Sequence, residues 1–440
     1  MLSVLANPTC RHLFAAQVIA LIGTRLATVA LGLLAWQIAG KNAGLVLGTA
    51  LAIKMVAYVT LAPIASAFAD RLPRRTMLVA LDLIRATVAV ALPFVTEVWQ
   101  VYVLIFLLQA ASAGFTPTFQ ATIPDVLPEE ADYTRALSLS RLAYDLENLL
   151  SPLLAAALLT VVSFPVLFGG TVVGFLASAT LVLTVTLPSP RPAAQRGVWV
   201  RTTRGIRNYL ATPRLRGLLA LNLCVAAAGA MVIVNTVVIV QAGLGLAETQ
   251  VALALAAFGA GSMTAAAVLP RLLDRMPDRP PMIAGAAILA AGMLLGPLVG
   301  SLPALGALWL ILGFGYSLTQ TPTGRLLRRS AQPEDRPAIF AAQFALSHAC
   351  WLLTYPLAGW AGATFGLDAT FLILAGIAAL GLVAALRLWP AKLEDDIPHL
   401  HADLPSGHPH MAAHGTAAHH HPVVIDDLHR AWPYQTRPTG

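Results

Sequence analysis

The residues with the clearest chemistry lie in the last fifty positions of the chain. Nine of its eleven histidines are there, as two His-x-His pairs, a run of three and two single residues, with aspartates among them. Imidazole nitrogen and carboxylate oxygen together suit Ni, Cu, Zn or Co, and a flexible chain can wrap such an ion without prior folding. We therefore expect this tail to bind a divalent transition metal and to be disordered until it does. The histidines are His399, His401, His408, His410, His414, His419, His420, His421 and His429.

A second group of polar residues stands within one long apolar run. Arg141, Asp145 and Glu147 fall on a single polar arc of a helix at about 100° per residue. A carboxylate held away from bulk water can act as a proton or cation site. The alternative is a buried ion-pair network in which Arg141, Arg25 or Lys54 neutralises the two carboxylates. We expect Asp145 or Glu147 to carry a proton or a cation.

Further polar residues stand in the middle of other apolar runs. Arg25 is one of them, and a charge at such depth costs at least about 2.5 kcal/mol on insertion scales. Arg25 should therefore face protein or water and not lipid. Asn222 and His348 stand on later runs. His348 either contacts a substrate or, as a lone histidine, is satisfied within the core. We predict that Arg25, Asn222 and His348 border the same pathway as Arg141, Asp145 and Glu147.

Two short charged loops separate apolar runs at corresponding places. Both read Asp-Arg-x-Pro-x-Arg, and the second follows the first by 204 positions. Pro152 and Pro356 stand at the same offset, so the chain is predicted to be a duplication. The residues of the two loops are Asp70, Arg71, Arg74 and Arg75, and then Asp274, Arg275 and Arg279.

The composition indicates a membrane protein. The chain is 57% hydrophobic and 11% charged, whereas soluble domains are about 25% charged. A helix needs about 20 apolar residues to cross a bilayer. We predict an all-α membrane fold of twelve transmembrane helices, arranged as two parallel six-helix repeats. The predicted spans are 14–38, 44–67, 76–95, 98–119, 135–162, 165–187, 217–241, 249–272, 282–300, 305–326, 338–361 and 367–389.

Arginines are concentrated in every second gap between these spans. Such a bias marks the cytoplasmic side, so both termini are predicted to lie in the cytoplasm and the protein to be a multi-pass protein of the inner (plasma) membrane. The same bias accounts for the net charge of +7 without a nucleic-acid partner. The predicted parts are a six-helix bundle (1–189), an arginine-rich cytoplasmic linker (190–216), a second bundle (217–389) and a disordered tail (390–440).

The duplicated loop and the twelve spans resemble the major facilitator superfamily over residues 12–389. Ser66 and Pro73 replace two glycines of the family's loop. The resemblance implies a gating role for Asp70, Arg71, Arg74 and Arg75. The body is also similar to the proton-coupled exporter branch, and the histidine-rich tail is similar to that of nickel-resistance efflux proteins.

These features predict a secondary exporter of a divalent transition metal, nickel first and cobalt next, by proton antiport and alternating access. Two alternatives stay open: an exporter of amphiphilic drugs or siderophores whose tail is incidental, and a membrane metal sensor that transports nothing. The chain has no G-x-x-x-x-G-K-[ST] motif, so we expect neither an enzyme nor a required cofactor. The expected partners are the lipid bilayer, protons and a metal ion or small-molecule substrate, bound by a monomer.

Overall fold

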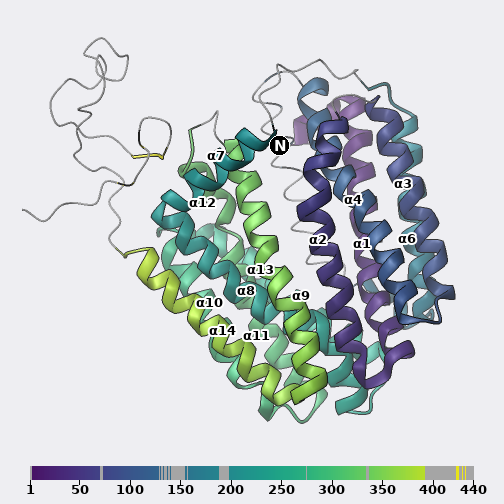
Figure 1. Cartoon of the computed structure of the whole chain (residues 1–440), viewed down its shortest axis with the longest axis vertical. Coiled ribbons are helices and arrows are strands. Elements are labelled where there is room, and N and C mark those ends of the chain that lie inside the picture. The colour runs from purple at the N-terminus through teal and green to yellow at the C-terminus, as the bar shows by residue number, and fades with distance from the viewer. Residues whose placement is uncertain are drawn as a thin grey trace, which may run out of the picture.

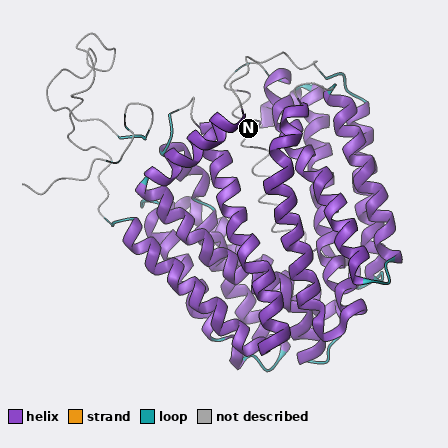
Figure 2. Cartoon of the chain, viewed as in Figure 1, coloured by secondary structure: helices purple, strands orange, loops and turns teal. Residues whose placement is uncertain are grey.

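The computed structural model describes residues 2–69, 73–127, 157–187, 198–273, 275–332 and 336–391, with residues 129, 132, 136, 139, 154, 155, 423–425, 429 and 432. The described chain is helical almost throughout, and its helices form two bundles that stand side by side (Figure 1; Figure 2). Among the described helices, the first bundle holds α1, α2, α3, α4 and α6, and the second holds α7 to α14. The two-bundle plan therefore follows the two copies seen in the sequence.

Two residues fix the start of α1, the first helix of the first bundle. Pro8 stands at the first position of α1, and the Asn7 side chain accepts a hydrogen bond of 3.1 Å from the Cys10 amide, a normal N-terminal cap. Small residues let α1 and α6 approach, and Thr171 Oγ1 donates to the Gly23 carbonyl at 2.8 Å. The helices are α1 (Pro8–Ala39), α2 (Ala43–Ala69), α3 (Arg74–Ala91), α4 (Val98–Val126) and α6 (Phe164–Leu183).

The second bundle is built around α8, which α9, α10, α11, α13 and α14 surround. Its amphipathic first helix, α7, lies within the predicted linker and packs on α13, where Tyr209 Oη donates to Gln343 Oε1. Burial raises the pKa of the Tyr209 phenol above its usual range. The helices are α7 (Val198–Ala211), α8 (Pro213–Val237, continued by a π-helix at Val238–Gly243), α9 (Glu248–Leu273), α10 (Arg279–Leu294), α11 (Leu302–Gln320), α12 (Thr323–Arg329), α13 (Arg336–Phe365) and α14 (Leu367–Leu388).

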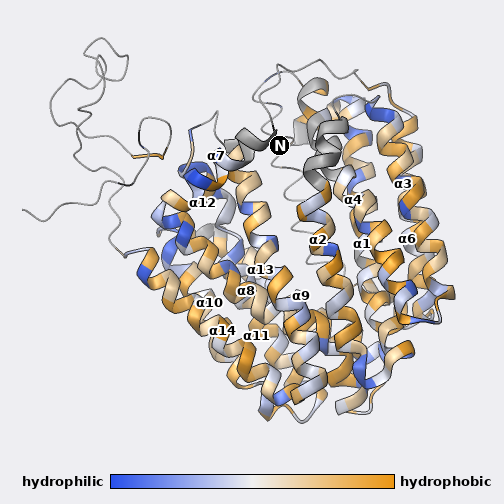
Figure 3. Ribbon diagram, in the orientation of Figure 1, coloured by the Kyte–Doolittle hydropathy of each residue, from blue (hydrophilic) through white to orange (hydrophobic). Residues whose placement is uncertain are grey.

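Most of these helices are long and apolar enough to cross a membrane. Within the described residues there are nine such stretches, of which the first, Pro8–Leu61, contains both α1 and part of α2, and α10 is a shorter apolar helix. Figure 3 shows hydrophobic residues along both bundles and hydrophilic ones around α12. The predicted all-helical membrane fold of two six-helix repeats is confirmed. The predicted fifth span, 135–162, lies largely outside the described residues.

The structure differs from the predicted spans mainly at one place. The predicted span 305–326 is two helices, because α11 ends at Gln320 and α12 begins at Thr323. Pro322 lies between them, and a proline inside a helix removes one backbone hydrogen bond and clashes with the preceding turn. Arg325 and Arg329 of α12 lie at the loop before α10.

The two bundles meet where α2 lies along α13. A Cβ atom added to Gly48 would lie 2.5 Å from the Tyr355 carbonyl oxygen, and one added to Gly359 would lie 2.3 Å from the Gly44 carbonyl oxygen. Both distances are too short for any side chain. This junction therefore depends on glycine on both helices, as close helix crossings in membranes often do.

Candidate functional site

A cavity of about 120 Å³ lies between the bundles, lined by residues of α1, α8, α9 and α11. Its polar lining residues all carry hydroxyls, namely Thr28, Thr236, Ser262 and Tyr316, and the others are apolar or glycine. Sites for drug-sized ligands occupy about 300–1,000 Å³. In this conformation the cavity fits only a small molecule, and a larger one requires the bundles to move apart.

Two of the cavity hydroxyls donate to carbonyl oxygens of their own helices. Thr28 Oγ1 donates to the Thr24 carbonyl at 3.0 Å, and Thr236 Oγ1 donates to the Val232 carbonyl while it accepts from Trp309 Nε1 at 2.9 Å. Both hydroxyl protons are used in these hydrogen bonds. Thr28 can therefore only accept a hydrogen bond from a ligand, through the lone pairs of its oxygen. The cavity is thus an apolar space with a few hydrogen-bonding points.

The predicted pathway residues fall only partly within the described chain. Arg141, Asp145 and Glu147 lie outside the described residues, and the side chain of Arg25 does too. Asn222 is 3% exposed and accepts from Gln320 Nε2 at 3.2 Å, while its Nδ2 has no hydrogen-bond partner among the described residues. Two buried N–H donors are costly to leave unmatched. Asn222 can therefore bind a further polar group, but it is not among the residues that line the cavity, and its place on the pathway stays a prediction.

His348 lies at the junction of the bundles and is not among the residues that line the cavity. Its ring is 3.9 Å from the Phe344 ring and 5.8 Å from the ring of Tyr58 on α2, and its Nδ1 is 2.7 Å from the Phe344 carbonyl oxygen. Lys54 Nζ lies 5.8 Å from the Tyr58 ring centre. The described structure thus places His348 against Tyr58 of α2.

The first charged loop is described in part. Asp70 and Arg71 lie outside the described residues. Arg74 begins α3 and is buried, whereas Arg75 is exposed and Arg75 Nη2 donates to the Leu183 carbonyl at the end of α6. Arg75 therefore ties the start of α3 to α6 of its own bundle. The gating role of this loop stays a prediction.

The second loop is also described in part, and it shows a contact that the sequence analysis missed. Asp274 lies outside the described residues, Arg275 is exposed, and Arg279 Nε donates to the Trp389 carbonyl at 2.8 Å. The unpredicted residue is Asp278, whose side chain is 1% exposed. It lies in the loop that precedes α10.

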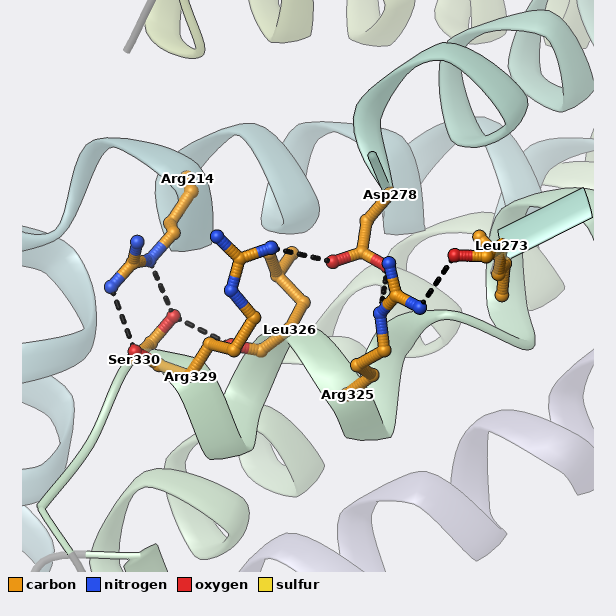
Figure 4. Close-up of polar contacts among 7 residues, drawn as sticks. All are labelled: Arg214, Leu273, Asp278, Arg325, Leu326, Arg329 and Ser330. Atoms are coloured by element: carbon orange, nitrogen blue, oxygen red, sulfur yellow. Dashed lines mark hydrogen bonds and ion pairs between the residues drawn. The ribbon is translucent and has the colours of Figure 1, made fainter. Parts of the chain in front are cut away.

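Asp278 forms ion pairs with two arginines of α12 (Figure 4). Arg325 Nε lies 2.7 Å from Oδ1 and Arg329 Nη1 lies 3.4 Å from Oδ2, and Arg325 Nη1 also donates to the Leu273 carbonyl at 2.9 Å. Asp278 follows Arg74 by the repeat offset of 204 positions, so the two loops carry opposite charges at this place. Comparing the two loops for positions of opposite charge would have identified Asp278 from the sequence.

Replacing Asp278 by alanine is expected to lower the free energy of unfolding by about 1–2 kcal/mol. The loss is moderate because Arg325 and Arg329 are 37% and 49% exposed and water can solvate them once the carboxylate is gone. Unfolding of the purified protein, followed by circular dichroism, measures it. The exposed neighbour Arg275, changed to alanine, serves as the control and should cost less than about 0.5 kcal/mol. Equal losses for the two variants would contradict a stabilising role of the ion pairs.

The predicted metal site falls mostly outside the described residues. Eight of the nine tail histidines lie there, and the ninth, His429, is described and buried. Across the ranges that the structure describes, no group of three His, Cys, Asp or Glu side chains is arranged to hold a metal ion. Metal binding by the tail therefore stays a prediction.

Comparison with known proteins decides the family. The model of the Major Facilitator Superfamily matches residues 13–236 and again residues 218–405. The chain belongs to the Major Facilitator Superfamily. The first match covers nearly all of the first bundle, and the second covers most of α8 and all of α9 to α14, as the predicted repeat requires. Membership confirms the predicted superfamily and a membrane protein of transporter type that is not an enzyme.

One curated relative aligns with a short part of this superfamily member. It is an uncharacterized MFS-type transporter of Bacillus subtilis (strain 168), YfiS, with 27% identity over 123 residues. That alignment spans 28% of this chain and 29% of the relative. It therefore supports the family and carries no activity over to the whole protein.

Solved structures of similar fold cover nearly the whole superfamily body. A bacterial homolog of the human lysosomal transporter Spinster, inward-facing and unoccupied, superposes with a TM-score of 0.68 at 14% identity, over 88% of this chain and 98% of that one. A D-xylose–proton symporter gives 0.63 at 16% identity, over 87% and 98%. A POT family transporter in complex with 5-aminolevulinic acid gives 0.66 at 10% identity, over 88% and 96%. At these identities the likeness shows the shared fold alone.

Proposed function

We propose that this member of the superfamily is a secondary transporter in which the two bundles rock about the cavity between them. The supporting observation is the position of that cavity, because α1 of one bundle and α8, α9 and α11 of the other line it together. A site shared by two repeats changes its access when the repeats rotate against each other. The α2–α13 glycine junction is then the contact that holds the bundles in the conformation described here.

The lining of the cavity favours a small amphiphilic organic molecule as the cargo. Alkyl and aromatic side chains dominate it, and hydroxyls are its polar groups. Ni²⁺ and Co²⁺ are bound by imidazole, thiolate or carboxylate, which this lining does not offer. Organic cargoes bind in apolar pockets with a few hydrogen-bonding groups. Of the functions predicted from sequence, the described geometry supports the organic exporter best.

Export of nickel or cobalt is the second candidate, and the observation that favours it is the tail with its nine histidines. The carboxylates predicted for the metal pathway, Asp145 and Glu147, lie outside the described residues. In this candidate the tail collects the ion in the cytoplasm and the helices pass it across. A membrane metal sensor that transports nothing is the third.

Flux measurements on the purified protein in sealed vesicles separate the three candidates. We expect ethidium to be moved and Ni²⁺ not, and deletion of residues 391–440 to leave ethidium flux unchanged. Ni²⁺ flux that this deletion abolishes would instead establish the metal exporter. No flux of either probe would favour the sensor.

A matched pair of variants tests the cavity itself. Ser262 lines it, whereas Thr264 stands on the same helix with its side chain exposed. Ser262→Phe fills the cavity and is expected to lower ethidium flux by roughly 5- to 150-fold, since overpacking of this kind costs about 1–3 kcal/mol. Thr264→Phe should leave the flux as it is. An equal loss of flux in the two variants would mean that the cargo binds outside this cavity.

Proton antiport, outward direction and orientation belong to the same proposal and rest on the sequence. We assign the proton step to Asp145 or Glu147 and place both termini in the cytoplasm, where the arginine-rich loops lie in the positive-inside arrangement. In vesicles with an imposed pH gradient, Asp145→Asn or Glu147→Gln should abolish gradient-driven flux and leave downhill exchange intact. Unchanged gradient-driven flux in both variants would reject the assignment.

A further inference from the structure

The far end of the tail packs on the second bundle. Val423, Ile425 and Trp432 are 0%, 2% and 4% exposed and form a small apolar cluster with Ala211, the last residue of α7. The sequence analysis expected a tail that is disordered until it binds a metal, whereas these three side chains are buried. Apolar side chains gain free energy when they leave water for an apolar surface. The burial of these three side chains in a polar tail therefore indicates a specific contact.

The burial alternates along the tail as an extended segment requires. Val423 and Ile425 are buried, while Val424 between them is half-buried. Successive side chains of an extended chain point to opposite sides. One side of this segment therefore faces the protein and the other faces away.

A charge contact adds specificity to the apolar one. The guanidinium of Arg214 lies over the Trp432 ring, with its Cζ 5.4 Å from the ring centre. Arg214 stands in the first turn of α8, just after the corner where α7 ends. A guanidinium near an indole face is attracted by the ring. The elbow between α7 and α8 thus offers both a small apolar patch and a cation.

The same turn of α8 receives the start of the tail. Trp389, the residue after α14, packs on Gly217, where an added Cβ would lie 2.5 Å from the Trp389 Cβ. Positions 214 and 217 are three residues apart and so lie on one face of a helix. Trp389, at the start of the tail, thus lies beside Gly217, and Trp432, near its end, lies beside Arg214.

The elbow is also joined to the charged loop of the second bundle. Arg214 Nε donates to Ser330 Oγ at 2.8 Å and Arg214 Nη2 donates to the Arg329 carbonyl at 2.9 Å (Figure 4). Arg329 in turn pairs with Asp278. A continuous set of contacts therefore runs from Trp432 through Arg214 and α12 to the loop before α10.

We propose that the α7–α8 elbow is a docking site for the chain's own C-terminal segment, held through Val423, Ile425 and Trp432. The partner of this surface is thus intramolecular, and it brings both ends of the histidine-rich segment to one turn of α8. Docking places the tail in contact with the linker that joins the bundles and, through Arg214, with the Asp278 loop. The proposal holds whichever cargo the protein carries.

Limited proteolysis of the full-length protein tests the docking. Trypsin cleaves after Arg430, which stands between the docked residues in the sequence. Cleavage there is expected to be at least about tenfold faster in Ile425→Asp or Trp432→Ala than in the unchanged protein, because it follows the population of the released segment. Val424→Asp introduces the same charge one residue away, on the side that faces outward, and should leave the rate within about twofold. Equal acceleration by Val424→Asp and Ile425→Asp would overturn the proposal.

Two further experiments test where the C-terminal segment docks. Ala211→Glu changes the elbow and not the tail, and it should release the segment to the same extent, with thermal unfolding used to show that the bundle is intact. Tail variants that act while Ala211→Glu does not would place the docking surface elsewhere and overturn the assignment. Protection that rises with protein concentration would show docking between copies and would equally refute an intramolecular site.

Discussion

Replacing Asp82 by alanine is expected to lower the free energy of unfolding by about 3–5 kcal/mol, because it leaves a buried guanidinium without its counter-charge. Asp82 and Arg85 form an ion pair on α3 in which the side chains are 0% and 5% exposed. Ser178 of α6 donates to the second carboxylate oxygen at 2.7 Å. Arg85 lies between Phe115 and Phe175, with its Cζ 4.1 and 4.4 Å from the two ring centres. Water cannot replace the carboxylate in such a place.

Equilibrium unfolding in mixed micelles measures this loss, and a double variant tests its cause. Asp82→Leu combined with Arg85→Met removes both charges and should regain most of the stability, since an apolar pair of similar volume often replaces a buried ion pair at no cost. Asp368→Ala, at an exposed position in the first turn of α14, is the control and should cost less than about 1 kcal/mol. A double variant as unstable as Asp82→Ala would mean that packing and not charge explains the effect.

Replacing Gly48 by valine is expected to move the bundles out of the described conformation. The new Cβ would lie 2.5 Å from the Tyr355 carbonyl oxygen and 3.3 Å from Gly359 Cα, and both are backbone atoms that cannot turn aside. Overpacking of this kind costs about 1–3 kcal/mol, which favours any state in which α2 and α13 separate by roughly 5- to 150-fold. Flux that requires this junction to close should fall by a similar factor.

Thiol labelling of the cavity shows whether the junction opens. A cysteine in place of Ser262, in a protein whose three native cysteines are replaced, reports access to the cavity from the side where α1 joins α2. We expect Gly48→Val to raise the labelling rate from that side. Gly376→Val is the matched control, because a Cβ at Gly376 on α14 meets nothing within 4 Å. If both valines change labelling alike, the glycine junction does not hold the bundles together.

Much of this fold could be predicted because lipid imposes a simple rule on sequence. A helix must be long and apolar to cross the bilayer, so spans such as Val98–Val126 and Leu367–Leu388 are visible as composition. The repeated loop identified the superfamily because a duplication preserves spacing. The start of α1 was predicted too late, because the apolar run begins at Phe14 whereas the helix begins at Pro8 after its cap at Asn7.

The candidate site was less predictable, because its members are chosen by packing. Ser262 and Tyr316 look like ordinary residues of apolar helices, and only the arrangement of α9 and α11 brings them to one cavity with Thr28. His348 stood out as polar, yet it lies at the α2–α13 junction and does not line the cavity. Polarity shows that a residue needs a partner and does not show which one.

The sequence by itself determined the apolar character of the spans, the twofold repeat and the family, because these depend on runs and spacings along one chain. The tertiary structure alone decided that Asp278 pairs with Arg325 and Arg329, that Gly48 meets Tyr355, and that Trp432 lies against Arg214. Those contacts join residues about 50 to 300 positions apart. Their distances follow from how whole helices pack, and no local pattern of residues records that packing.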